Sequence, residues 1–140
     1  MIWKKEFTID DINQFRDNTL VGHIDIRFLE KGDDFLTADM PVDGRTKQPM
    51  GLLHGGASVV LAETLGSTAS YLALEEGFTS VGLDINANHI KSVSEGRVTG
   101  KARAVHLGRT TQVWEINIKN EQGGLVCTSR LTMAVLKNRS

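Results

Sequence analysis

Cysteine, excess basic charge and long apolar runs are all scarce or missing in this 140-residue sequence. The single cysteine, Cys127, excludes an intrachain disulfide framework and any zinc site built from several thiolates. Lysine and arginine (16 residues) are balanced by aspartate and glutamate (17 residues), so the composition gives no support for nucleic-acid binding. No stretch approaches the roughly 20 apolar residues that span a bilayer, and the first residues contain no signal-peptide core. We therefore expect a cytoplasmic protein with no membrane partner.

Low-complexity tracts, internal repeats and linkers are also missing, which predicts one domain over residues 1–140. Helices are expected from Thr8 to Phe15, with Thr8 as N-cap and Ile9, Ile12 and Phe15 on one face, and from Gly55 to Glu76. Strands are expected over residues 23–29, 35–40, 81–88, 97–106, 111–120 and 125–136, with Val81, Leu83, Ile85 and Ala87 alternating on one face.

The long helix is apolar on nearly every side, which is typical of a buried helix. Consecutive strands joined by short turns indicate antiparallel pairing. We therefore expect an α+β fold in which a curved antiparallel sheet wraps around this helix. Since one helix cannot cover both faces of a sheet, the remaining surface is expected to meet another copy of the chain.

An acidic residue interrupts this apolar helix. Glu63 lies between Val59-Val60-Leu61-Ala62 and Thr64-Leu65, where an unpaired buried carboxylate costs several kcal/mol. Ser67 follows four residues later on the same face, where its hydroxyl can hold a water or substrate atom against the carboxylate. The structural alternatives are a glutamate paired with an arginine or pointing to solvent, and a serine that lets the helix pack closely.

The start of the helix, Gly51-Leu52-Leu53-His54-Gly55-Gly56, is the second candidate site. Free N–H groups and the positive end of the helix dipole favour negative charge there, and glycines let a carbonyl approach the backbone. This is the arrangement of an oxyanion hole. The alternative is a plain glycine-rich loop with a capping histidine.

Gln48, His54-Gly55-Gly56, Glu63 and Ser67 together resemble the hotdog-fold acyl-CoA thioesterases, in the branch of the Arthrobacter-type 4-hydroxybenzoyl-CoA thioesterase. Four longer runs resemble bacterial 1,4-dihydroxy-2-naphthoyl-CoA hydrolases of menaquinone synthesis and their enterobactin-associated proofreading relatives. These runs are MPVDGRTKQPMGLLHGGASVVLAETLGS, VGLDINANH, HLGRTTQVWEI and SRLTMAVL. The resemblance extends over nearly the whole chain.

The resemblance implies a set of catalytic roles. Glu63 is expected to act as nucleophile or general base, and the Gly55 N–H to stabilise the oxyanion. Gln48 is expected to polarise the thioester carbonyl or position water, Ser67 to orient water, and His54 to bond substrate or leaving group. It also implies an active site at a dimer interface, with dimers usually pairing into a tetramer.

The same resemblance implies the residues that bind coenzyme A, which is part of the substrate rather than a cofactor. They are Gly82, the segment His89, Ile90, Lys91 and Ser92, and the turn His106, Leu107, Gly108, Arg109, Thr110 and Thr111. The histidines show no metal-ligand spacing, so no metal is expected.

Three alternatives stay open on the sequence alone. The reaction can be that of an acyl-carrier dehydratase on the same fold, which pairs a loop histidine with a helix acid. The substrate can be a misacylated aryl group on an acyl or aryl carrier protein. The domain can also bind acyl-CoA without turning it over.

Overall fold

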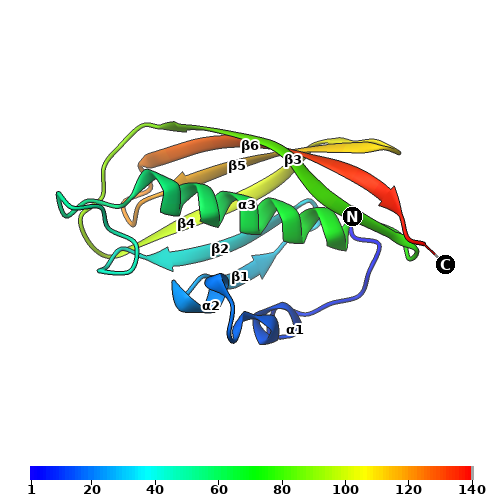
Figure 1. The fold of residues 1–140 in the computed structure, drawn as a ribbon, viewed down its shortest axis with the longest axis horizontal. Helices are drawn as coiled ribbons and strands as arrows, with labels where there is room; N and C mark the ends of the chain where they lie inside the picture. The colour runs from blue at the N-terminus through cyan, green and yellow to red at the C-terminus, as the bar shows by residue number, and fades with distance from the viewer. Residues whose placement is uncertain (140) are drawn as a thin grey trace.

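A computed structural model describes residues 1–139 as one six-stranded antiparallel sheet with a long helix on its concave face (Figure 1). The strand order is β1-β2-β4-β5-β6-β3, so β1 and β3 form the two edges. The strands are β1 (Arg27–Lys31), β2 (Phe35–Pro41), β3 (Phe78–His89), β4 (Arg97–Leu107), β5 (Thr111–Lys119) and β6 (Leu125–Lys137). The helices are α1 (Ile9–Asn13), the 3-10 helix η1 (Gln14–Arg16), α2 (Leu20–His23) and α3 (Gly55–Leu72). The predicted fold class is confirmed. No helix within residues 1–139 is long and apolar enough to cross a membrane.

The first helix begins where predicted. The Thr8 hydroxyl accepts a hydrogen bond from the Asp11 N–H, and the Asp11 carboxylate accepts one from the Thr8 N–H, which is a capping box. The helix ends at Asn13 and continues as η1, which contains Phe15; this side chain is 79% exposed, whereas Ile9 and Ile12 are partly buried. The helix is therefore shorter than the predicted Thr8–Phe15, although Phe15 still lines the same groove as Ile12.

The predicted strand over residues 23–29 is wrong at its start. Thr19 caps the short helix α2, and Asp25 adopts a left-handed backbone conformation (φ 55°) that interrupts an extended chain. The strand therefore begins only at Arg27. The hairpin with Phe35–Pro41 forms as predicted, with Arg27 opposite Asp39.

The central helix α3 is shorter and less enclosed than predicted. It ends at Leu72, where the Lys5 ammonium donates to the carbonyls of Tyr71 (3.1 Å) and Leu74 (2.6 Å). Its face toward the sheet, including Leu61 and Leu65, is buried. Tyr71 is 49% exposed, so the expectation of burial on every side does not hold within one chain. The buried core between this face and the sheet is built around residues such as Leu36, Met40, Trp114, Ile116 and Leu131.

A bulge at Leu83 changes the predicted alternation along β3. Gly82 pairs with Met133 and Asp84 with the adjacent Thr132, so one extra residue stands between them. Ile85 and Ala87 pack against the core after the bulge, whereas Val81 (46%) and Leu83 (61%) are exposed. This edge strand therefore presents apolar side chains and an unpaired backbone edge.

Candidate active site

His54 closes the start of α3 and leaves one backbone donor available. Its Nδ1 accepts a hydrogen bond from the Gly56 N–H (2.8 Å), and its carbonyl accepts bonds from Ala57 and Ser58 (3.0 and 3.2 Å). The Gly55 N–H finds no acceptor among residues 1–139. The positive end of an 18-residue helix therefore holds a free N–H beside two glycines, a geometry that suits a developing oxyanion.

The capping hydrogen bond also determines which nitrogen of the neutral His54 ring carries the proton. A nitrogen that accepts a hydrogen bond carries no proton, so the proton of the neutral ring lies on Nε2. His54 is exposed, and Nε2–H can donate to a ligand at the helix start. Capping and substrate binding are thus compatible roles for the two nitrogens.

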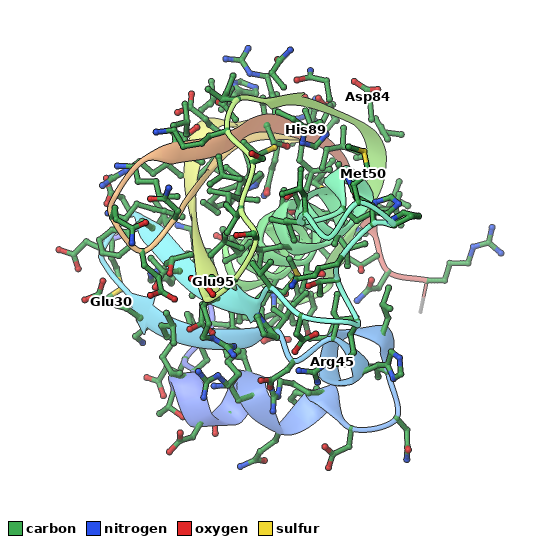
Figure 2. All side chains as sticks on the ribbon, turned by 90° about the vertical axis from the view of Figure 1, so that its left-hand side faces the viewer. Glu30, Arg45, Met50, Asp84, His89 and Glu95 are labelled. Atoms are coloured by element: carbon green, nitrogen blue, oxygen red, sulfur yellow. The ribbon has the colours of Figure 1, made fainter. Side chains whose placement is uncertain are left out.

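A cavity of about 310 Å³ opens beside this helix start. Its wall includes Gln48, Gly55 and the predicted coenzyme A segment His89, Ile90, Lys91 and Ser92. A Cβ at position 55 would lie 2.9 Å from His89 Nε2, so the ring approaches the helix start because residue 55 is glycine. Figure 2 faces this end of the molecule, with His89 above the start of the helix and Asp84 at the outer rim.

Gln48 is held by the loop that precedes the helix. Its backbone N–H donates to the Leu52 carbonyl (2.8 Å), and its side-chain Oε1 accepts from the Met50 N–H. With the amide oxygen engaged, the amide NH₂ is the group left to meet a ligand. Gln48 therefore offers the cavity a donor suited to a carbonyl oxygen.

Glu63 lies further along α3 and is exposed in the single chain. It takes part in no ion pair and no side-chain hydrogen bond within residues 1–139, so no arginine satisfies it. Its Oε2 lies against Gly82 of β3, 3.1 Å from where a Cβ at that position would stand. Glu63 was expected to be buried or at an interface; one chain does not bury it, so its place at an interface stays a prediction, and the missing Cβ at Gly82 leaves room for the carboxylate.

The two halves of the predicted site are separated within one chain. Gly55 and Glu63 are eight residues apart on one helix, which is about 12 Å along its axis at 1.5 Å per residue. Ser67 lies one turn beyond Glu63 and lines a different groove. One chain therefore does not bring the Gly55 N–H and the Glu63 carboxylate to the same carbonyl.

The predicted coenzyme A turn lies at the opposite end of the sheet. The Gly108 N–H donates to the Thr111 carbonyl (2.9 Å), and the Thr110 carbonyl accepts from Val135 (2.9 Å). Leu107, Gly108 and Arg109 line a groove with Ala73 and Leu74, just beyond the end of α3, and His106 stands over Gly108. In Figure 1 this end is on the right and the helix start is on the left. One chain does not join this turn to His89–Ser92.

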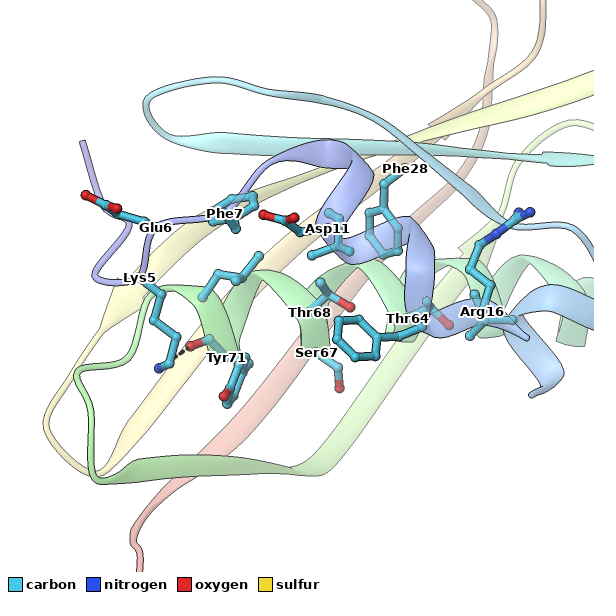
Figure 3. Close-up of a pocket in the computed structure, with 14 residues that line it drawn as sticks. Lys5, Glu6, Phe7, Asp11, Arg16, Phe28, Thr64, Ser67, Thr68 and Tyr71 are labelled. Carbon is cyan, nitrogen blue, oxygen red and sulfur yellow. Dashed lines mark hydrogen bonds between the residues drawn. The ribbon is translucent and has the colours of Figure 1, made fainter. Parts of the chain in front are cut away.

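A larger groove of about 540 Å³ lies between α3 and the N-terminal segment (Figure 3). Thr64, Ser67, Thr68 and Tyr71 of α3 line one side, and Phe7, Ile12, Phe15, Val21 and Phe28 line the other. Among the residues of this groove, only Ser67 was predicted to be catalytic. The available signal was the spacing i, i+3, i+4, i+7 of four hydroxyl residues on one helix face.

A network of ion pairs around Arg97 links the N-terminal segment to the sheet, away from the candidate site. The Arg97 guanidinium donates to both oxygens of Asp39 (2.9 and 3.0 Å) and to Asp25 (3.4 Å), which also accepts from Arg16 (3.0 Å). Partial burial opposes ionisation of Asp25, but the Arg16 hydrogen bond and the Arg97 charge lower its pKa.

Burial alone raises the pKa of the Cys127 thiol. No group of three or more His, Cys, Asp or Glu side chains suited to a metal ion occurs within residues 1–139.

A curved six-stranded antiparallel sheet around one long helix is the hotdog fold. The family model described as "Thioesterase superfamily" matches residues 50–127, so the chain belongs to this superfamily and is a thioester hydrolase.

Individual relatives agree with this assignment. The chain is 57% identical over 136 residues to the 1,4-dihydroxy-2-naphthoyl-CoA hydrolase of Escherichia coli, covering 97% of this chain and 100% of that protein. It superimposes on a thioesterase from Haemophilus influenzae with a TM-score of 0.96, at 53% identity, over 98% of this chain and 96% of the other. A mutant thioesterase from Pseudomonas aeruginosa also gives 0.96, at 49% identity, over 99% and 100% of the two chains.

Proposed function

We propose that this protein hydrolyses aromatic acyl-CoA thioesters to the free acid and coenzyme A, with 1,4-dihydroxy-2-naphthoyl-CoA as its substrate in menaquinone synthesis. The observation that carries this proposal is the 57% identity to the Escherichia coli hydrolase of that compound, over the full length of that protein. The acyl-CoA substrate and the thioester chemistry are those of the superfamily, and the aromatic group is the finer part of the proposal.

The helix start binds the thioester carbonyl in this mechanism. Its oxygen accepts from the Gly55 N–H, with the His54 Nε2–H and the Gln48 amide as further donors. Negative charge that develops on this oxygen is stabilised by the positive end of α3. One such donor is worth roughly 3 kcal/mol of transition-state stabilisation.

Glu63 acts on the carbonyl carbon. It either attacks this carbon to form an anhydride that water then hydrolyses, or takes the proton from an attacking water. In both routes the carbon–sulfur bond breaks and coenzyme A leaves as a thiolate, a good leaving group that needs no strong acid. The Ser67 hydroxyl, one turn along the helix, orients the water.

This mechanism requires two chains. Because Gly55 and Glu63 are about 12 Å apart on one helix, Glu63 of one copy meets Gly55 of another. The open edge of β3 with its exposed Val81 and Leu83 supports pairing of two copies along this strand. The same pairing brings the turn at Arg109 of one copy toward Lys91 of the other, where coenzyme A carries its phosphates.

Steady-state kinetics test the proposal. Wild type and Glu63→Gln are compared on 1,4-dihydroxy-2-naphthoyl-CoA, benzoyl-CoA, hexanoyl-CoA and an aryl-loaded carrier protein, with released thiol as the readout. We expect the naphthoyl ester to give the highest kcat/KM, and Glu63→Gln to lose about 10² to 10⁴-fold in kcat because it can neither attack nor accept a proton.

Two results would contradict the proposal. Higher efficiency on the loaded carrier protein would identify a proofreading thioesterase instead. Full activity of Glu63→Gln would exclude both roles assigned to this carboxylate.

A further inference from the structure

The groove between α3 and the N-terminal segment has the size and lining of a small-molecule site. Its volume of about 540 Å³ falls within the ~300–1,000 Å³ typical of such pockets. One wall is the hydroxyl face of α3 at residues 64, 67, 68 and 71, and the other is aromatic and aliphatic. Figure 3 shows Phe7 and Phe28 across from Thr64, Ser67, Thr68 and Tyr71.

The groove begins beside the proposed reaction centre. Thr64 directly follows Glu63, and Ser67 lies one turn further on the same face as Glu63. An acyl group whose carbonyl carbon is held at Glu63 can therefore extend along the helix into this groove.

Three of the four charged side chains of the groove are engaged by the protein; the fourth, Glu6, is exposed and forms no ion pair or side-chain hydrogen bond within residues 1–139. Lys5 donates to the carbonyls at the end of α3 and stands 4.3 Å from the centre of the Tyr71 ring. Asp11 accepts from the Thr8 N–H, and Arg16 donates to Asp25 and the Ile26 carbonyl. Apart from the Glu6 carboxylate, the groove thus offers a ligand rings and hydroxyls rather than free charge.

Phe15 is held in place from both sides. The Asn13 amide bonds both the N–H and the carbonyl of Phe28 (2.9 and 3.0 Å), which fixes the segment just before Phe15 to the edge of the sheet. Arg16 fixes the next residue through Asp25 and Ile26. The ring between these two anchors lines the groove yet remains 79% exposed, so a ligand can cover it without moving the backbone.

We propose that this groove receives the acyl group, and that Phe15 is a specificity-determining residue that selects flat aromatic rings. The hydroxyls of Thr64, Thr68 and Tyr71 line the other wall and can meet hydroxyl groups on the ring, so the preferred class is a hydroxylated aromatic acid. This inference rests on the proposed hydrolysis of aromatic acyl-CoA and adds the residue that selects the ring.

Phe15→Ala, Phe15→Leu and a matched control, Leu20→Ala, test the inference. Leu20 is an exposed apolar residue (56%) of the same segment that does not line this groove. We expect Phe15→Ala to lose about tenfold in kcat/KM on 1,4-dihydroxy-2-naphthoyl-CoA, mainly through KM, because an offset aromatic contact is lost. Hexanoyl-CoA should change less than about twofold, Phe15→Leu should fall between, and Leu20→Ala should match wild type.

The outcomes separate the two proposals. A wild type that hydrolyses no aromatic ester refutes both the substrate class and the role of Phe15. A wild type active on aromatic esters, with Phe15→Ala losing equally on hexanoyl-CoA or behaving like Leu20→Ala, refutes the role of Phe15 alone. Circular dichroism melts of all three variants show whether any loss comes from unfolding.

Discussion

At the scale of single residues, Gly82 sets how closely the Glu63 carboxylate can lie against the sheet. A Cβ at position 82 would stand 3.1 Å from Glu63 Oε2, closer than ordinary van der Waals contact. The resemblance assigned Gly82 to coenzyme A binding, and its contact with Glu63 adds a second reason for glycine at this position.

Larger side chains at position 82 should therefore displace the carboxylate. We expect Gly82→Val to lower kcat on the order of 10²-fold, the effect of about 1 Å of misplacement, and Gly82→Ala to lower it less. The measurement is kcat on the preferred acyl-CoA together with a melting curve. Gly44→Ala serves as control, because a Cβ there meets nothing within 4 Å. Undiminished kcat in Gly82→Val would show that this contact does not position Glu63.

The residues of the candidate site could be predicted better than their arrangement. Gln48, Gly55 and His89 meet at one cavity, and the capping alternative for His54 is confirmed. Glu63 was expected to be buried or at an interface because its neighbours in sequence are apolar; one chain leaves it exposed, so the interface stays a prediction. The sequence placed Phe15 with Ile9 and Ile12 on one helix face and gave it no part in the site, whereas in the structure it lies in η1 with an exposed ring.

At the scale of elements, the order of helices and strands followed from the sequence, and the errors came from backbone conformations that side-chain patterns do not encode. The left-handed residue Asp25 delays β1, and the bulge at Leu83 reverses the alternation along β3. In each case tertiary pairing decides the local geometry, since a period-two pattern reads equally well with or without an inserted residue.

The attachment of the N-terminal helices to the sheet depends on ionised Asp25. Because the folded-state pKa of Asp25 is lowered from 3.8, its ion pairs stabilise the fold above that value, and this stability is lost as pH falls through the folded pKa. Asp25→Asn keeps a residue that tolerates the left-handed conformation but removes the charge.

We expect Asp25→Asn to lower Tm by roughly 2–5 °C at pH 7, since the variant loses charge-assisted hydrogen bonds to two arginines. The difference from wild type should shrink below about pH 3.8. Melting curves from pH 3 to 8 measure this, with the exposed Asp33→Asn as control. A difference in Tm that does not vary with pH would show that the charge of Asp25 is not what holds the segment.

At the scale of the whole molecule, the separation of Gly55 from Glu63 predicts that subunits complement one another. Chains carrying Gln48→Ala and Glu63→Gln are co-expressed with different tags, and the mixed dimers are isolated. One of the two sites then has both residues intact, so we expect about half of wild-type activity, well above either variant alone. Mixed dimers no more active than the mean of the two parental variants would place both residues in the same site of one chain.

The hydrogen bonds of Asn13 to β1 limit how many copies of the chain can pair through their sheet edges. By bonding both backbone groups of Phe28, its side chain occupies a position that an incoming strand would need on β1, and β1 is only five residues long. The sheet is thus blocked at one border and open along the twelve residues of the other. When two copies pair through their β3 edges, neither copy keeps a free β3 edge. Association through this edge therefore stops at a dimer and cannot propagate into a fibre.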